Sequence, residues 1–427
     1  MSNDIRVVIS GLGPMCSAGF GKDQLWTSVT SEKARLSTEF FTNDDRGSNS
    51  FYCHKLEFFN IDAFALDADI LNWIRDWKGG NDDIDLFYLA AVSKLALNDS
   101  GLQYDPNNNS VGFVVAHENP GLETFFDSAI CNTFEYVKKN PNESKANLMR
   151  NVYEKCAQIG YDTQTFMYLF FLAKLFSAHG FSLFVNNACA SGAYAIEVAS
   201  QQIREKRCSA VVVAGIDRQS IYKHWWLNSL KLYASDGLIK PFSKYRNGFV
   251  LGEGGAALVL ESQESAEKRG ANIYAEYIGG GFNLESGKVS LPSVERDFYS
   301  ECISSALTRS KISPNDIDLI NPHGIGTSIT DLYEARAIDR VCAKSLVSAF
   351  KPYFGHNLGS CALLELCLLL LSLKQNYVPR TLNCEPIDEK IKINIAVKAL
   401  KKELKTVMKL SSGFAGYNAA MIFRKIS

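Results

Sequence analysis

Short apolar runs alternate with longer mixed segments along the whole chain. In the first half this pattern predicts strands at 5–10, 111–116, 181–185, 210–215 and 256–260, and helices at 22–31, 84–99 and 192–204. In the second half it predicts strands at 273–279, 317–323 and 346–351, and helices at 294–310, 331–342 and 358–375. Because strands alternate with helices in both halves, the pattern indicates an α/β protein.

The segment 122–179 departs from this rhythm. It is rich in Phe and Tyr, and its middle part, 138–145, is polar. This pattern predicts helices on either side of a surface loop. The join at 261–269 is short and charged, so we expect two halves, residues 1–262 and 263–427, with the enlarged 122–179 region in the first.

Composition narrows the class of protein. The chain has 427 residues, of which 46% are hydrophobic and 21% charged, and a net charge of −1. These values are typical of a globular protein with a large core, and they give no global field that would attract nucleic acid. The apolar run 361–373 is too short to span a bilayer and contains Glu365, so it predicts a buried helix rather than a membrane segment.

Cysteine usage and the first residues indicate the compartment. The eleven cysteines are scattered, without a C-x-x-C pair for zinc or redox chemistry. The stretch 1–6 lacks the basic start and apolar core of a signal peptide. We therefore expect free thiols in a reducing cytoplasm.

Glycines follow the first predicted strand, in Gly11-Leu12-Gly13-Pro14. They could suggest a dinucleotide-binding turn. However, the third glycine of G-x-G-x-x-G is missing and Pro14 follows the second glycine, so this interpretation is weak.

Cys189 is the strongest candidate for chemistry. It lies between an apolar run that ends at Val185 and a helical segment that starts at Gly192. Most cysteines are small buried hydrophobes, so Cys189 alone would not indicate catalysis. A corner at a helix N-terminus, however, favours a thiolate and therefore a nucleophile.

Two histidines strengthen the case for Cys189. His323 and His356 both lie in glycine-rich turns between predicted strands and helices. Glycine neighbours let a substrate approach an imidazole closely. A single histidine of this kind is more often structural, but two such turns together with the Cys189 corner form a constellation that rarely arises by chance.

At these motifs the chain resembles the β-ketoacyl-ACP synthases, the condensing enzymes of fatty-acid and polyketide synthesis. The resemblance holds its order and spacing from residue 6 to the C-terminus, and its Cys-His-His set is similar to the elongating, KAS II-like branch. The matching stretches are Asn187-Ala188-Cys189-Ala190-Ser191-Gly192, Gly248-Phe249-Val250-Leu251-Gly252-Glu253-Gly254, Asn321-Pro322-His323-Gly324-Ile325-Gly326-Thr327 with Asp331 and Glu334, Lys351 with Gly355-His356, and Gly413-Phe414-Ala415-Gly416-Tyr417-Asn418.

The resemblance implies a fold and an activity. The fold is the thiolase fold, a five-layer αβαβα sandwich of two similar halves, usually paired as a dimer. The activity is decarboxylative Claisen condensation of a Cys-bound acyl chain with malonyl-ACP, which makes the protein an acyltransferase. The implied partners are an acyl carrier protein and a second subunit, either an identical copy or a chain-length-factor-like homologue. No metal, bound cofactor, nucleic acid or membrane is implied.

The resemblance also implies residue roles. Cys189 carries the acyl chain, His323 and His356 stabilise the enolate, and the backbone N–H groups of Cys189 and Phe414 form the oxyanion hole. Lys351 and Glu365 match a charged pair that organises the site, although a purely structural salt bridge would look the same. The remaining residues expected to contact the pantetheine arm or the acyl chain are Thr327, Ser290, Gly413 and Ala415.

Several positions depart from the family pattern. Ile325 stands where relatives usually carry Thr, which removes a hydrogen bond to pantetheine, and Ala415 and Tyr417 stiffen a loop that is usually richer in glycine. The stretch 115–121 replaces a glycine-rich loop. Asp82 and Asp83 lie where basic residues often meet the carrier protein, with Arg75 and Lys78 nearby, so docking at that patch is in doubt.

These departures favour a specialised type II polyketide or polyene ketosynthase over a housekeeping enzyme. Two alternatives stay open. A chain-length-factor-type partner would shape the tunnel of a catalytic subunit, but such partners typically lose the cysteine. An acyltransferase or thiolase-like variant would use Cys189 without decarboxylation, although thiolases lack this pairing of two histidines with Lys351.

Overall fold

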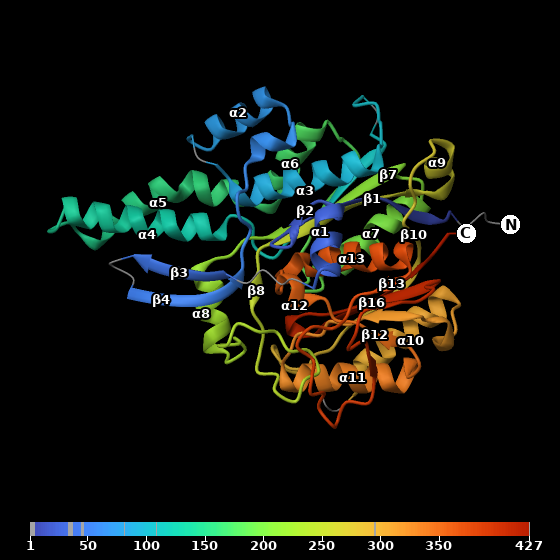
Figure 1. Ribbon diagram of the computed structural model, residues 1–427. Coiled ribbons are helices and arrows are strands. Elements are labelled where there is room, and N and C mark those ends of the chain that lie inside the picture. Colours follow the sequence, from blue (N-terminus) through green and yellow to red (C-terminus); the bar gives the residue numbers. More distant parts are fainter. Residues whose placement is uncertain are drawn as a thin grey trace.

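The protein is described here by a computed structural model, which covers residues 5–32, 37–43, 47–80, 82–107, 109–293 and 296–426 (Figure 1). The helices are α1 (Lys22–Thr30), α2 (Ala68–Trp77), α3 (Ile84–Ser100), α4 (Leu122–Lys139), α5 (Lys145–Asp162), α6 (Thr165–Phe176), α7 (Ser191–Arg204), α8 (Ile221–Ser229), α9 (Gln263–Lys268), α10 (Phe298–Ser310), α11 (Ser328–Cys342), α12 (Lys351–Phe354) and α13 (Cys361–Gln375).

Most strands join one mixed sheet. Its strands are β1 (Val7–Cys16), β2 (Gly19–Phe20), β5 (Val111–Ala116), β6 (Ser182–Val185), β7 (Ala210–Asp217), β9 (Gly254–Ser262), β10 (Ala275–Leu284), β11 (Leu319–Asn321), β12 (Leu346–Val347), β14 (Asn394–Ile395), β16 (Thr406–Ser412) and β17 (Tyr417–Arg424). Two small sheets are formed by β3 (Ser37–Asn43), β4 (Gly47–His54) and β8 (Leu251–Gly252), and by β13 (Tyr377–Val378) and β15 (Leu400–Lys401).

The main sheet contains the same strand arrangement twice. One part runs β6-β5-β7-β9-β1 and the other runs β12-β11-β16-β17-β10. In both, the first three strands are parallel and the next pairings are antiparallel. Strands β1 and β10 join the two parts over only three residue pairs, from Val7 with Tyr277 to Ile9 with Ala275.

Five layers follow from this duplication (Figure 1). Helices α3 and α6 cover one outer face, α10 and α11 cover the other, and α7 and α13 lie between the two parts of the sheet. Residues of β7 alternate between the central core, as Val211 and Val213 do, and the outer core under α3, as Val212 does. Strands buried on both faces read as continuous apolar runs, as the sequence indicated. The α/β class and the five-layer fold are therefore confirmed.

Helix α13 is buried. Among the described residues, Leu358–Gln375 is the one helical stretch that matches a membrane span in length and apolar composition, and 89% of it lies inside the protein. Glu365 lies in this helix and pairs with Lys351 of α12 and Lys409 of β16, as described below. This confirms the buried helix predicted at 361–373.

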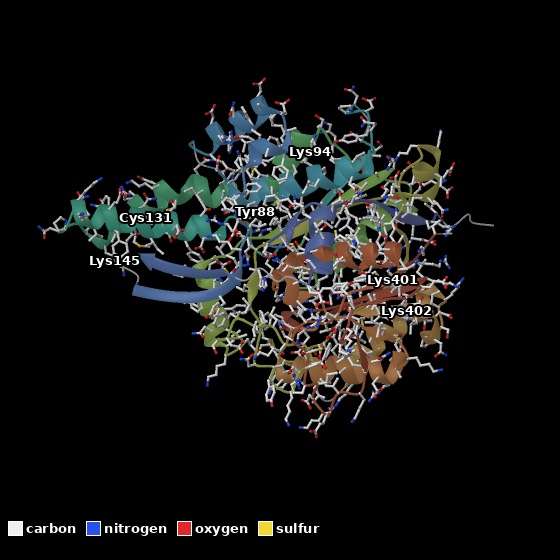
Figure 2. All side chains as sticks on the ribbon, viewed as in Figure 1. Tyr88, Lys94, Cys131, Lys145, Lys401 and Lys402 are labelled. Atoms are coloured by element: carbon white, nitrogen blue, oxygen red, sulfur yellow. The ribbon has the colours of Figure 1, made fainter. Side chains whose placement is uncertain are left out.

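The segment 122–179 forms three helices. Helices α4 and α5 pack side by side as an arm that projects from the body, and Figure 2 places Cys131 and Lys145 along it. The polar loop between them runs from Asn140 to Ser144, where the sequence predicted it. Helix α6 returns the chain to the body.

Some boundaries differ from the predictions. Strand β1 continues to Cys16 through the glycines, which the sequence suggested as a turn. The β3–β4 hairpin and α2 were not predicted. Helix α10 begins at Phe298, and the first two residues of the predicted helix 294–310 lie outside the described residues. The division into residues 1–262 and 263–427 stays a prediction.

The glycines of β1 let α3 pack directly on the strand. A Cβ on Gly13 would overlap Val92 O and come within 2.5 Å of Ala96 N, both in α3. A Cβ on Gly11 would overlap Ala96 O and come within 2.7 Å of the Ser100 side chain. Close packing of helix on strand, rather than a phosphate-binding turn, accounts for the Gly11-x-Gly13 pattern.

We expect Gly13→Ala to lower the free energy of unfolding by about 2 kcal/mol, because α3 must move away from β1. Urea unfolding followed by circular dichroism measures this. Gly160→Ala, within helix α5, is the matched control, because its Cβ would meet only the Phe125 ring, at 3.3 Å. The control should be neutral or slightly stabilising, and equal stabilities for the two variants would contradict the packing account.

Candidate active site

Cys189 lies in a tight corner between β6 and α7. Ala188 adopts a left-handed backbone with φ of 49°, which is strained for a residue with a side chain. The Ser191 hydroxyl fixes the corner, since it accepts from Asn187 N at 2.8 Å and donates to Ala188 O at 2.6 Å. The corner thus holds the thiol just ahead of the helix, as the sequence predicted.

His356 contacts the thiol directly. Its Nε2 lies 3.2 Å from Cys189 Sγ, and the His323 ring is edge-on to the His356 ring with centroids 5.4 Å apart. All three side chains are buried. A Cβ on Gly355 would meet the Gly252 backbone at 2.7 Å, so glycine is required where this turn crosses strand β8.

Two acids of α11 hold the His323 turn. Glu334 accepts from His323 N at 2.6 Å and from Gly324 N at 2.8 Å. Asp331 accepts from Ile325 N at 3.1 Å and from Gly326 N at 3.0 Å. Backbone N–H groups that would otherwise be unpaired in the core are satisfied in this way. Asp331 and Glu334, noted from the motif, therefore position the histidine.

A cluster of three charges lies behind the histidines. Glu365 Oε2 accepts from Lys351 Nζ at 2.9 Å and from Lys409 Nζ at 2.8 Å. Lys351 also donates to His323 O at 2.6 Å, and Lys409 donates to Pro322 O at 3.2 Å. All three charged side chains are fully buried.

Sequence reasoning missed Lys409. The signal was available, because a lysine interrupts the apolar strand 406–410 and a buried lysine needs a partner. The partner itself could not be identified, because Glu365 lies far away in the sequence.

Burial and these lysines keep both histidines neutral. Burial lowers the pKa of His323 well below 6.5, and Lys351, His356 and Lys409 lower it further. Burial, followed by Lys351 and Lys409, does the same to the pKa of His356. At neutral pH each ring therefore carries one N–H and no charge.

The sequence predicted a thiolate at Cys189, but the surroundings of this cysteine favour the neutral thiol. Burial raises the pKa of the Cys189 thiol well above its ordinary value, and Glu118 and Cys361 raise it further. Lys351 acts in the opposite direction but does not compensate. Burial thus favours the protonated thiol in the free protein, and this thiol must lose its proton before the sulfur acts as a nucleophile.

A cavity of about 130 Å³ opens onto the cysteine. Cys189, His323 and Phe414 line it, as do other residues expected to bind substrate, namely Ser290, Thr327 and Gly413. Ile325, which replaces the usual Thr, also lines the cavity.

The loop after β16 lies over the cysteine. A Cβ on Gly413 would be 3.3 Å from Cys189 N, so the loop reaches the proposed oxyanion site. Ala415, expected at the substrate, is not among the lining residues of the cavity. It adopts φ of 63° and its N–H donates to Val289 O at 2.7 Å, so it holds the loop instead.

The basic residues near α2 are neutralised. Arg75 pairs with Asp82 at 2.9 Å, and Lys78 pairs with Asp83 at 2.8 Å. The Lys78 ammonium also lies 5.1 Å from the centre of the Phe171 ring. Both cations are therefore occupied within the protein, which supports the doubt about carrier-protein docking at this patch.

Comparison with known families shows to which family the chain belongs. The description "Beta-ketoacyl synthase, N-terminal domain" matches residues 4–266, and "Beta-ketoacyl synthase, C-terminal domain" matches residues 274–385. The chain belongs to the β-ketoacyl synthase family. Together the two matches cover every motif identified in the sequence except the C-terminal glycine loop.

Named relatives of this β-ketoacyl synthase align over its whole length. It is 28% identical to 3-oxoacyl-(acyl-carrier-protein) synthase 2 of Rhizobium meliloti, over 98% of this chain and 99% of that protein. It is 26% identical to Nodulation protein E of Rhizobium leguminosarum bv. trifolii, over 99% of this chain and 100% of that protein.

Solved structures share the fold. The ishigamide ketosynthase/chain length factor superposes with a TM-score of 0.84 at 23% identity, covering 99% of this chain and 100% of that one. A β-ketoacyl synthase from Burkholderia phymatum superposes with a TM-score of 0.81 at 25% identity and the same coverage.

We expect Glu365→Gln to lower the free energy of unfolding by about 3–5 kcal/mol, because it leaves two buried lysines without a counter-charge. Lys409→Met is the matched comparison, since it leaves a neutral pair of Lys351 and Glu365 and should cost much less. Denaturant unfolding at pH 7.5 measures both. A larger loss for Lys409→Met than for Glu365→Gln would contradict this account.

We also expect His323 and His356 to stay neutral between pH 8 and pH 5. Their pKa values lie well below 6.5 in the folded protein, so they take up a proton only at lower pH. NMR of the protein labelled with ¹⁵N-histidine measures this, and His323→Asn and His356→Asn spectra assign the signals. Titration of either ring near pH 6.5 would show that the lysines and burial do not act as described.

Proposed function

We propose that this β-ketoacyl synthase is an acyltransferase that condenses an acyl group on Cys189 with a malonyl group delivered by an acyl carrier protein. The contact between Cys189 Sγ and His356 Nε2, with His323 beside it at a buried cavity, carries this proposal. One nucleophile and two neutral hydrogen-bond donors are the groups that the two half-reactions need.

The first half-reaction loads the cysteine. Cys189 Sγ attacks the carbonyl carbon of an acyl-pantetheine thioester, and the pantetheine thiol leaves with the cysteine proton. The backbone N–H groups of Cys189 and Phe414 stabilise the tetrahedral oxyanion. The Gly413 backbone lies against Cys189 N, which supports this assignment.

The second half-reaction forms the carbon–carbon bond. The malonyl group loses CO₂, and the electrons of the broken bond become an enolate. His323 and His356 each donate one N–H to the enolate oxygen and remain neutral. The enolate carbon then attacks the acyl group and the thioester C–S bond breaks. Cys189 leaves as a thiolate, which takes up a proton from solvent to return to the thiol. Lys351 and Glu365 position His323 through its carbonyl oxygen.

Thr327, Ser290 and Gly413 line the route of the pantetheine arm in this proposal, since all three border the cavity at Cys189. The arm needs no bound cofactor of the protein itself, because it arrives attached to the carrier. Ile325 offers an apolar surface where a hydroxyl would donate. The carrier protein docks away from Arg75 and Lys78, which are paired internally.

In this proposal, a second subunit covers the projecting arm that helices α4 and α5 form. Helix α4 carries an exposed apolar stripe whose residues are spaced by one helical turn: Phe126, Ile130, Phe134 and Val137. Strand β6 lies at the edge of the main sheet, and its Leu183 is exposed. Apolar stripes and open sheet edges are typical of surfaces that pair with another chain. The partner is a second copy or a chain-length-factor-like homologue.

The pathway is fatty-acid or type II polyketide synthesis, and the departures at Ile325, Ala415 and the stretch 115–121 favour the specialised polyketide or polyene type. A role as a non-catalytic chain-length-factor-type partner is disfavoured, because the nucleophile and both histidines are assembled. A cytoplasmic site of action fits the eleven scattered cysteines, which include no C-x-x-C pair.

We expect acyl-ACP to acylate Cys189, and malonyl-ACP then to release CO₂ and give the β-ketoacyl product. Intact-protein mass spectrometry follows the mass on Cys189, and ¹⁴C release follows decarboxylation. Cys189→Ala should take up no acyl group, whereas Cys131→Ser, an exposed cysteine on α4, should behave as the wild type. Acylation without condensation would favour the acyltransferase alternative. No acylation, even with candidate partner subunits present, would reject the condensing activity.

A further inference from the structure

Glu118 contacts the sulfur of Cys189, which His356 also contacts. It lies just after β5, in the stretch 115–121 that replaces the usual glycine-rich loop. Its Oε1 accepts from the Cys189 thiol at 3.8 Å, within the range of a sulfur hydrogen bond. Its own carbonyl oxygen accepts from Asn186 Nδ2 at 2.6 Å, which ties the Glu118 backbone to the cysteine corner.

The space for this side chain is built into the neighbouring turn. Gly359, in the 3₁₀ turn Leu358–Ser360 that precedes α13, faces Glu118, and a Cβ at Gly359 would come within 3.2 Å of Glu118 Cγ. A larger residue at 359 would therefore push the carboxyl group off the sulfur. The carboxyl is held at Cys189 by packing as well as by its hydrogen bond.

Charged groups from further elements lie around Glu118 and the neighbouring His117. Lys223 of α8 pairs with Asp217, at the end of β7, at 3.5 Å. Asp85 of α3 lies 3.7 Å from the neighbouring His117. Burial raises the pKa of Glu118 to about 7, and Asp217 adds to this, whereas Lys223, His117 and the Cys189 thiol act in the opposite direction. The carboxyl group therefore changes its protonation near neutral pH.

The histidine rings are poorly suited to accept the thiol proton, because they resist a positive charge. His356 lies closer to the sulfur than Glu118 does, but Lys351 and Lys409 oppose a positive charge on its ring. In the condensation step its N–H is needed as a donor to the enolate. A separate proton acceptor lets His356 keep one protonation state through both half-reactions.

We propose that Glu118 is a catalytic base that takes the Cys189 thiol proton while the acyl group is transferred to the sulfur. This inference rests on the proposed condensing function. The S–H bond of Cys189 and the C–S bond of the incoming thioester break, and a new C–S bond forms at Cys189. The proton passes to the Glu118 carboxylate and then to the departing pantetheine sulfur, so the base is regenerated.

The test is the single-turnover acylation of Cys189 in the full chain. Acetyl and hexanoyl thioesters of pantetheine serve as donors without malonyl-ACP, and intact-protein mass spectrometry gives the rate from pH 6 to pH 9. The wild-type rate should rise with pH around a midpoint near 7, where Glu118 loses its proton. Glu118→Gln should lose this midpoint and be about 10²- to 10⁴-fold slower at pH 8, the usual range for loss of a general base.

Glu123→Gln is the matched control. Glu123 is a half-buried carboxylate in the first turn of α4, near the same Lys223, but its partner is Ile221 N at 3.4 Å rather than the cysteine. The substitution removes the same charge five residues away. Its acylation profile should match the wild type.

Alkylation of Cys189 by iodoacetamide separates proton transfer from packing. The negative charge of Glu118 raises the pKa of the thiol, so Glu118→Gln should move the alkylation profile to lower pH and speed alkylation at pH 8. A damaged corner would instead slow both alkylation and acylation. Faster alkylation with slower acylation is the result expected of a catalytic base.

Three results would overturn the inference, and they are distinguishable. If the wild type is acylated and Glu118→Gln is acylated as fast or faster, Glu118 is not the base and the condensing function stands. If the wild type accepts no acyl group from either donor or from acyl-ACP, the proposed function fails together with this inference. Slower alkylation and slower acylation in Glu118→Gln would assign the residue a structural role and also reject it as the base.

Discussion

The close packing of two central helices determines where the reacting groups meet. Gly192 in α7 faces α13, and a Cβ there would come within 2.9 Å of Leu363 Cγ. A Cβ on Gly215 in β7 would come within 3.0 Å of Cδ1 of the same leucine, so this glycine also leaves room for it. Because both helices start at this crossing, Cys189, just ahead of α7, lies beside Cys361, the first residue of α13. Cys361 Sγ donates to Cys189 O at 3.4 Å. The cysteine of one half and the histidines of the other are brought together by backbone packing that tolerates no larger residue.

This packing buries the charged groups of the site, and each charge must then be compensated within the protein. Glu365 offsets two lysines, which leaves the cluster with one positive charge facing the histidines. The same burial that keeps the imidazoles neutral also keeps Cys189 a thiol. A buried ion cluster of this kind adds little to stability. The cluster instead helps to keep His323 and His356 neutral, and the proposed second half-reaction depends on this protonation state.

The sequence predicted the local features and missed those created by distant contacts. The Cys189 corner and the two histidine turns are local motifs, and the structure assembles them as expected. The protonation of Cys189 was predicted wrongly, because the depth of burial is a property of the whole fold. Lys409 and Glu118 were not assigned a role, because their partners, Glu365 and Cys189, lie far along the chain. The motif also could not show that Ala415 holds the loop rather than lining the cavity.

The duplicated sheet gives a reason for Glu118 to lie where it does. Strand β5 of one half corresponds to β11 of the other in position and pairing, and β6 corresponds to β12. The residues that follow β5 and β11 are therefore equivalent, and they include Glu118 and His323 respectively. Both side chains point toward the same crossing of α7 and α13, from opposite halves. In the proposed mechanism, the site thus carries a carboxylate on the half that supplies the nucleophile and an imidazole on the half that stabilises the enolate. Loading needs a group that accepts a proton, whereas condensation needs groups that donate one without becoming charged, and the two halves of the fold meet these requirements separately.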